Sequence, residues 1–170
     1  MKNKTVIVIG SSRSNGNTRR VVDQLISLSS DIDIIDLNSY NIGFYDYDFK
    51  NRNDDFFPLF LKILEYDTII FATPIYWYTM SAQIKTFLDR ISDVLHEDKK
   101  VFGRKLRGKN LATISCGSDN EIFDGFTMPF EQTSNYLGMN YLGHLHTWLD
   151  NNSELPDIVK NKLKEFSTYL

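Results

Sequence analysis

The first apolar run of the chain, residues 6–9, reads Val-Ile-Val-Ile with no polar residue between its members. Such an unbroken run is typical of a strand covered on both faces, whereas a strand with one solvated face alternates apolar and polar residues. Gly10 ends the run, and Val21, Val22 and Leu25 then recur at helical spacing. The opening of the chain therefore predicts a buried parallel strand that leads through a loop into a helix.

The same alternation of strand and helix continues along the chain. Further strands are predicted at residues 32–37, 68–72, 111–115 and 141–149, and helices at residues 54–64, 84–95, 128–137 and 155–166. Five such units in series imply a parallel sheet with right-handed crossovers and helices on both faces. Without an internal repeat or linker, residues 1–170 are expected to form one domain. Ligands of such sheets bind beyond the carboxyl ends of the strands, so the candidate loops are residues 11–18, 73–80 and 115–120.

The loop at residues 11–18 suits an anion. It places hydroxyl, amide and arginine side chains before a helix N-terminus, where free N–H groups and the helix dipole attract negative charge. It is not a Walker loop, because five residues separate Gly10 from Gly16 and Asn17 replaces the lysine. It is not a dinucleotide fingerprint, because Ser12 stands at the second glycine. What remains is a site for a single phosphate monoester.

Three consecutive aromatic residues, Tyr76, Trp77 and Tyr78, follow the third strand. At this end of a strand they predict the wall of a pocket for a flat ring, since aromatic contacts add about 0.5–1.5 kcal/mol per pair beyond burial. A subunit contact is the alternative, because Trp and Tyr are also enriched at interfaces. Both interpretations hold if a flat cofactor lies at a subunit interface.

At these two segments the chain resembles the flavodoxin-like NADPH-dependent FMN reductase family, which includes small quinone reductases and iron–sulfur flavoproteins. Gly10-Ser-Ser-Arg-Ser-Asn-Gly-Asn-Thr18 resembles the FMN-phosphate loop of that family. Pro74-Ile-Tyr-Trp-Tyr, followed by Met80-Ser-Ala-Gln-Ile-Lys-Thr-Phe-Leu-Asp-Arg90, resembles its isoalloxazine loop and the helix after it. Ser81 stands where many relatives have proline. Residues 44–55 lack the cysteine cluster of the iron–sulfur branch, which excludes that chemistry.

The resemblance implies an α/β fold, namely a flavodoxin-like three-layer sandwich whose five-stranded parallel sheet has the order 2-1-3-4-5. It implies that FMN carries the chemistry, with no catalytic side chain and no metal, and that NAD(P)H delivers a hydride and gives way to an acceptor such as a quinone, a flavin or a nitroaromatic. The residues that it assigns to the FMN phosphate are Ser11, Arg13, Ser14, Asn15, Asn17 and Thr18. Those that it assigns to the flavin ring are Pro74, Ile75, Tyr76 and Trp77 on one side and Cys116, Gly117 and Ser118 on the other.

Several residues admit two interpretations. His144 and His146 alternate along the fifth strand, and we favour an edge strand over a metal site, because no third ligand lies near them in the sequence. Cys116 is interpreted as a small residue beside the flavin, with a reactive thiol as the alternative. The basic connector at residues 99–109 is expected to be a solvated loop, or to attract the extra phosphate of NADPH. The acidic segment 119–124 either caps the site or is simply exposed.

Composition limits the remaining functions. A net charge of −3 gives no electrostatic reason to expect nucleic-acid or membrane binding, and no apolar stretch approaches the length of a membrane span or signal peptide. The single cysteine excludes an internal disulfide, and we expect a cytoplasmic protein. Exposed aromatic residues around the site predict a homodimer or homotetramer. The alternative to a reductase is a flavodoxin-type electron carrier, which would bind FMN without oxidising NAD(P)H by itself; a nucleotide-binding regulatory module is a third alternative.

Overall fold

The computed structural model describes residues 3–29, 31–150, 152 and 154–169, in which strands and helices alternate along the chain. The strands are β1 (Thr5–Ile9), β2 (Ile32–Asp36), β3 (Thr68–Pro74), β4 (Asn110–Gly117) and β5 (Asn140–Trp148). The helices are α1 (Asn17–Ser27), α2 (Phe56–Ile63), α3 (Ala82–Arg90), α4 (Lys100–Gly103), α5 (Met128–Leu137) and α6 (Asp157–Ser167). All neighbouring strands pair in parallel in the order β2-β1-β3-β4-β5, which confirms the predicted sheet.

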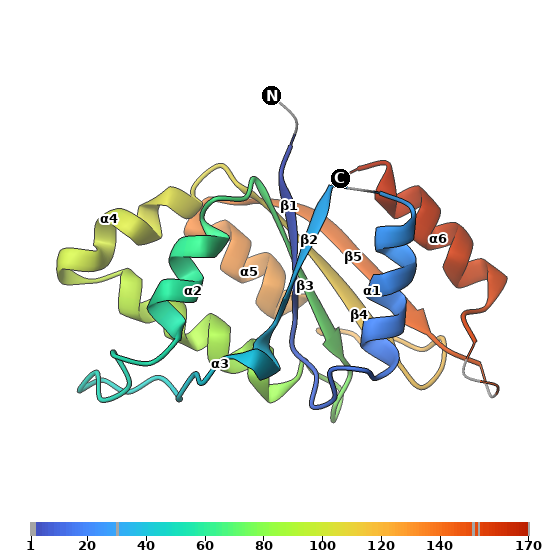
Figure 1. Cartoon of the computed structure of the whole chain (residues 1–170), viewed down its shortest axis with the longest axis horizontal. Coiled ribbons are helices and arrows are strands. Elements are labelled where there is room, and N and C mark those ends of the chain that lie inside the picture. Colours follow the sequence, from blue (N-terminus) through green and yellow to red (C-terminus); the bar gives the residue numbers. More distant parts are fainter. Residues whose placement is uncertain (1–2, 30, 151, 153, 170) are drawn as a thin grey trace.

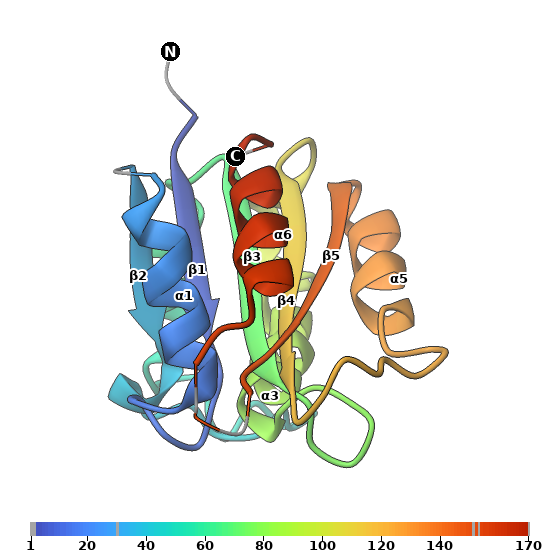
Figure 2. The ribbon, with the colours of Figure 1, turned by 90° about the vertical axis from the view of Figure 1, so that its right-hand side faces the viewer.

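The sheet is the middle of three layers. Helices α1 and α6 lie on one of its faces, and α2, α3 and α5 lie on the other (Figures 1 and 2). Each face has its own apolar core, because neighbouring residues of a strand point to opposite sides: Val6 and Val8 belong to one core and Ile7 and Ile9 to the other. The carboxyl ends of the strands meet at the lower edge in Figure 1. Within the described ranges, no helix is long and apolar enough to cross a bilayer.

Two segments between α3 and β4 differ from the prediction. Helix α3 ends at Arg90 instead of extending to residue 95, and Ile91–Val94 continues as a tighter 3-10 helix. The basic connector is not an open loop, because it contains α4 and a further 3-10 turn, Arg104–Leu106. Packing explains this difference: Leu106 is buried, and a β-carbon at Gly103 would lie 2.3 Å from the carbonyl oxygen of Val94.

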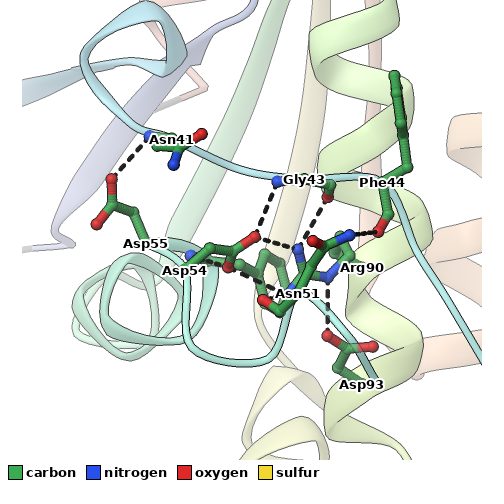
Figure 3. Close-up of polar contacts among 9 residues, drawn as sticks. Asn41, Gly43, Phe44, Asn51, Asp54, Asp55, Arg90 and Asp93 are labelled. Carbon is green, nitrogen blue, oxygen red and sulfur yellow. Dashed lines mark hydrogen bonds and ion pairs between the residues drawn. The ribbon is translucent and has the colours of Figure 1, made fainter. Parts of the chain in front are cut away.

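The side chain of Arg90 turns inward at the end of α3 and holds the loop that precedes α2 (Figure 3). Its Nε donates to Asp93 at 2.8 Å, and its terminal nitrogens donate to both carboxylate oxygens of Asp54 at 2.5 and 3.1 Å. The same terminal nitrogens donate to the carbonyl oxygens of Gly43 and Asn51 at 2.8 and 3.0 Å. Because Gly43 and Asn51 flank the loop at residues 44–50, this one guanidinium fixes both ends of that loop.

Candidate functional site

The loops that follow β1 and β3 are joined at the carboxyl edge of the sheet. The hydroxyl groups of Ser12 and Tyr76 are 2.8 Å apart, which ties the two loops together across 64 residues of sequence. From the segment after β2, the Asn38 amide nitrogen donates to the Ser11 carbonyl oxygen at 2.5 Å and to Ser14 Oγ at 3.3 Å. The loop after β1 is therefore held from both sides before helix α1 begins.

Helix α1 begins without a side-chain cap. Its cap residue is Gly16, so within the described residues no side-chain oxygen accepts from the first-turn N–H groups of Asn17 and Thr18. The side chains of Arg13, Asn15 and Asn17 around this end of the helix are exposed. They form no hydrogen bond to other described residues. Uncapped N–H groups, the positive end of the helix dipole and a free guanidinium together suit a phosphate group.

The aromatic loop after β3 is a tight and strained turn. Tyr76 and Thr79 exchange both backbone hydrogen bonds, at 3.0 and 3.2 Å. The two residues between them, Trp77 and Tyr78, have φ values of 48° and 68°. Positive φ at both central positions is the pattern of a type I′ turn, which normally contains Asn-Gly because bulky side chains are unfavourable there. Trp77 is 90% exposed, so the strained backbone of this turn does not bring the Trp77 side chain into the core.

This turn faces the segment after β4 across a hollow of about 300 Å³. Tyr78 and Phe123 meet edge to face there, with ring centroids 4.7 Å apart. The residues that line the hollow are Ile75, Trp77, Tyr78, Gly117, Ser118, Asp119, Glu121 and Phe123. Ile75, Trp77, Gly117 and Ser118, which the resemblance assigns to the flavin ring, are among these residues. Phe123 was not expected here, and its only local signal is its place in an acidic loop after a strand.

Pro74 and Cys116, which were also assigned to the ring site, pair with each other at the ends of β3 and β4 and are buried. The Cys116 side chain belongs to the core under α1 and α6, and it does not line the hollow. Burial raises the pKa of its thiol from 9.0 to about 11. A thiol of such pKa is almost wholly protonated at neutral pH, which disfavours the reactive alternative.

We expect the Cys116 thiol in the folded protein to react with a disulfide reagent at pH 8 about 100-fold more slowly than in the unfolded chain, because each pKa unit lowers the thiolate fraction about tenfold. Since this is the single cysteine, the release of chromophore reports on it alone. The same protein in denaturant is the control. Equal rates in the folded and unfolded states would show that the thiol is accessible.

The two histidines of β5 lie on the edge strand of the sheet, as predicted. Their ring nitrogens turn inward to one hydroxyl group: Ser115 Oγ is 2.7 Å from His144 Nε2 and 2.8 Å from His146 Nδ1. No local pattern indicates this contact, because Ser115 lies 29 and 31 positions before the two histidines, on the neighbouring strand.

The two halves of the site suit two parts of one ligand. The uncapped start of α1 with Arg13 fits a phosphate, and the hollow with its exposed Trp77 fits a flat ring. The hydrogen bond between the Ser12 and Tyr76 hydroxyl groups keeps these two halves adjacent. The residues present therefore fit FMN, a phosphate monoester of a flat heteroaromatic.

Comparison with known proteins agrees with this geometry. The model of the NADPH-dependent FMN reductase family matches residues 3–153. YwqN of Bacillus subtilis, whose name describes an NAD(P)H-dependent FMN-containing oxidoreductase, is 29% identical over 151 residues, covering 84% of this chain and 83% of that protein.

Among solved structures, the Trp repressor binding protein of Bacillus subtilis is similar with a TM-score of 0.76, at 24% identity over 95% of this chain and 96% of that one. An FMN-dependent NADH-azoreductase of Bacillus anthracis, solved with FMN, gives a TM-score of 0.70 at 11% identity over 99% of both chains. At these identities the likeness shows the flavodoxin-like fold. The match to the family model goes further: this chain belongs to the NADPH-dependent FMN reductase family, with FMN as its cofactor and NAD(P)H as its reductant.

Proposed function

We propose that this reductase passes electrons from NAD(P)H to a flat, uncharged acceptor of the quinone class, which enters at the aromatic hollow. Bound FMN supplies the redox chemistry, by accepting a hydride and giving up electrons to the acceptor. The chain itself would hold the phosphate with Ser11, Arg13, Ser14, Asn15, Asn17 and Thr18, and would present aromatic and backbone groups to the ring from Ile75, Trp77, Gly117 and Ser118. The exposed Trp77 is the observation that carries the proposal, because it offers an open stacking surface.

The charge at the rim of the hollow selects among acceptors. Asp119 and Glu121 line it, whereas no lysine or arginine does among the described residues. Carboxylates at a partly enclosed site disfavour an anionic acceptor, since like charges repel. An uncharged quinone should therefore be a better acceptor than free FMN or a sulfonated quinone.

The first test is an anaerobic titration of FMN-reconstituted protein with NADPH, which is expected to bleach the flavin absorbance. Steady-state oxidation of NADPH is then measured with a neutral naphthoquinone and with a sulfonated one of similar potential. We expect the neutral quinone to have a kcat/KM about tenfold higher or more, the effect of about 1.4 kcal/mol of repulsion. Flavin that stays oxidised with both NADPH and NADH would contradict a reductase and favour an electron carrier.

Two variants of the loop after β4 test whether the carboxylates that line the hollow select the acceptor. Glu121→Gln removes a negative charge from the hollow, and it is expected to reduce the difference in kcat/KM between the neutral and the sulfonated quinone. Asp124→Asn removes the same charge from an exposed residue of the same loop that does not line the hollow. An equal effect of both variants, or no effect of Glu121→Gln, would show that rim charge does not select the acceptor.

Replacing Trp77 by asparagine is expected to stabilise the fold while it weakens the site. Asparagine tolerates the left-handed backbone better than tryptophan, so the free energy of unfolding should rise by about 0.5–1 kcal/mol. Affinity for FMN should fall about tenfold, as expected when a stacking side chain is lost. Urea unfolding and quenching of flavin fluorescence measure the two effects. Tyr136→Asn, at an exposed helical position outside the hollow, is the control and should leave FMN binding unchanged.

A further inference from the structure

An irregularity in β5 turns both of its histidines toward β4. Leu111 pairs with Tyr141, but Ala112 pairs with Gly143, so Leu142 is an extra residue in β5. Gly143 has a φ of 109°, a value that favours glycine. After this bulge, His146 pairs with Ser115, and His144 pairs with Thr113, two positions earlier in the register. Because paired residues of neighbouring parallel strands point to the same side of a sheet, the bulge sets the face on which the imidazoles lie.

A chain of hydrogen bonds runs from the interior of the sheet to the hollow. His144 Nε2 contacts Ser115 Oγ at 2.7 Å, and Ser115 Oγ contacts His146 Nδ1 at 2.8 Å. His146 Nε2 then contacts the backbone carbonyl oxygen of Asp119 at 3.0 Å. Ser115 has no exposed surface and His146 is 8% exposed, so water does not compete freely for these groups.

The last acceptor, the Asp119 carbonyl oxygen, fixes which atom donates in each hydrogen bond of this series. A carbonyl oxygen only accepts, so His146 must carry its proton on Nε2. In the neutral ring Nδ1 is then an acceptor, and the single Ser115 proton must point to it. Ser115 Oγ in turn accepts from His144, which must also carry its proton on Nε2. The contacts therefore admit one arrangement for two neutral rings.

Both rings are held neutral by their surroundings. Burial, with a smaller contribution from the nearby His146, lowers the pKa of His144 from 6.5 to about 4. Burial also lowers the pKa of His146; Lys162 acts in the same direction, while the bond to Asp119 and its charge oppose the shift. Among the described residues, Lys162 and Asp119 are the charged groups that shift the pKa of His146. Neutral rings near pH 7 are consistent with the single arrangement of protons.

The hydrogen bond from His146 to Asp119 holds a segment that lines the hollow. Gly117, Ser118, Asp119 and Glu121 all line it, and only the Asp119 carbonyl oxygen in that segment receives a histidine N–H. The imidazole also lies directly under the start of the segment, because a β-carbon at Gly117 would come within 2.9 Å of His146 Cε1. His146 thus contacts the segment at two points, one polar and one steric.

We propose that His146 is a positioning residue: its Nε2–H form, which the Asp119 carbonyl oxygen requires and which Ser115 and His144 support, holds the segment 117–121 at the edge of the hollow. This inference rests on the proposed function only in taking the hollow as the place where the acceptor binds. Its structural part, the protonation pattern, concerns the chain alone.

Nitrogen-15 NMR of histidine-labelled protein tests the protonation pattern directly. The chain contains three histidines, and the His96→Gln variant identifies the third, so the spectrum is simple to assign. We expect both His144 and His146 to show a protonated Nε2 and an unprotonated Nδ1 at pH 7. Ser115→Ala removes the donor to Nδ1 of His146, so the signal of that nitrogen should shift toward the value of one without a hydrogen bond, while Nε2 stays protonated and donates to Asp119. A protonated Nδ1 on His146 in the unaltered protein would overturn the inference.

Two substitutions of His146 separate positioning from mere packing. The amide nitrogen of a glutamine side chain lies near the position of His146 Nε2 and can still donate to Asp119. The asparagine side chain is one carbon shorter, so its amide nitrogen reaches only the position of Nδ1. We expect His146→Asn to raise the KM for the neutral quinone about tenfold with kcat changed less than twofold, the size of effect of one lost buried hydrogen bond. His146→Gln should restore the KM.

An unchanged KM in His146→Asn, or equal losses in both variants, would overturn the positioning role. If His146→Asn does not fold, Gly117→Ala tests the same contact from the segment's side and should raise the KM likewise. If the unaltered protein takes up FMN but does not reduce quinones, the proposed function fails while the NMR pattern still tests the protonation.

Discussion

Replacing Arg90 by methionine is expected to lower the free energy of unfolding by about 3–5 kcal/mol, the cost of removing one partner from a buried ion pair. Arg90 is 1% exposed, and its loss leaves the carboxylates of Asp54 and Asp93 without their cation in a largely buried position. It also releases the carbonyl groups of Gly43 and Asn51. Urea unfolding followed by circular dichroism measures the loss.

The same helix supplies the control. Lys85 pairs with Asp89 at 2.6 Å, but both side chains are about half exposed. Lys85→Met should therefore cost no more than about 1 kcal/mol, as surface ion pairs do. Should Arg90→Met be too unstable to isolate, Arg90→Lys keeps the charge but not the planar fork, and we expect a smaller loss of about 1–3 kcal/mol. A loss below 1 kcal/mol in Arg90→Met would show that the cluster does not stabilise the loop.

Asn17→Asp is expected to weaken FMN binding about 100-fold or more, because a carboxylate at the start of α1 repels the phosphate; a pair of unit charges about 4 Å apart interacts by about 4 kcal/mol near a protein surface. Stability without FMN should move the other way. A carboxylate in the first turn of a helix without a side-chain cap is favourable by about 0.3–1 kcal/mol. Flavin fluorescence measures the first effect and urea unfolding the second.

Opposite signs in the two measurements distinguish a phosphate site from general damage. Gln24→Glu changes the net charge equally on the same helix, away from its N-terminus, and should alter FMN affinity little. Higher salt should weaken the effect of Asn17→Asp, since screening reduces exposed charge interactions. Unchanged FMN affinity in Asn17→Asp would place the phosphate elsewhere and contradict the loop assignment.

The strands and the loops that meet at the carboxyl edge could be predicted from local patterns. The apolar run at residues 6–9 required a doubly covered strand, and parallel strands bring the loops after β1, β3 and β4 to one edge. The resemblance of two separated motifs then supplied the strand order and the cofactor. The errors lie where packing overrides periodicity, as at the end of α3, where the chain tightens and Asp93 reaches Arg90.

The amino-acid sequence by itself thus determined the architecture, the place of the site and the family, because periodicity and short motifs depend on neighbouring residues. The tertiary structure alone decided how the site is shaped. The bulge at Leu142 and the contact of His146 with Asp119 depend on pairings between distant segments. Which partner a buried polar group finds is set by the register of those segments, and no local pattern of residues specifies it.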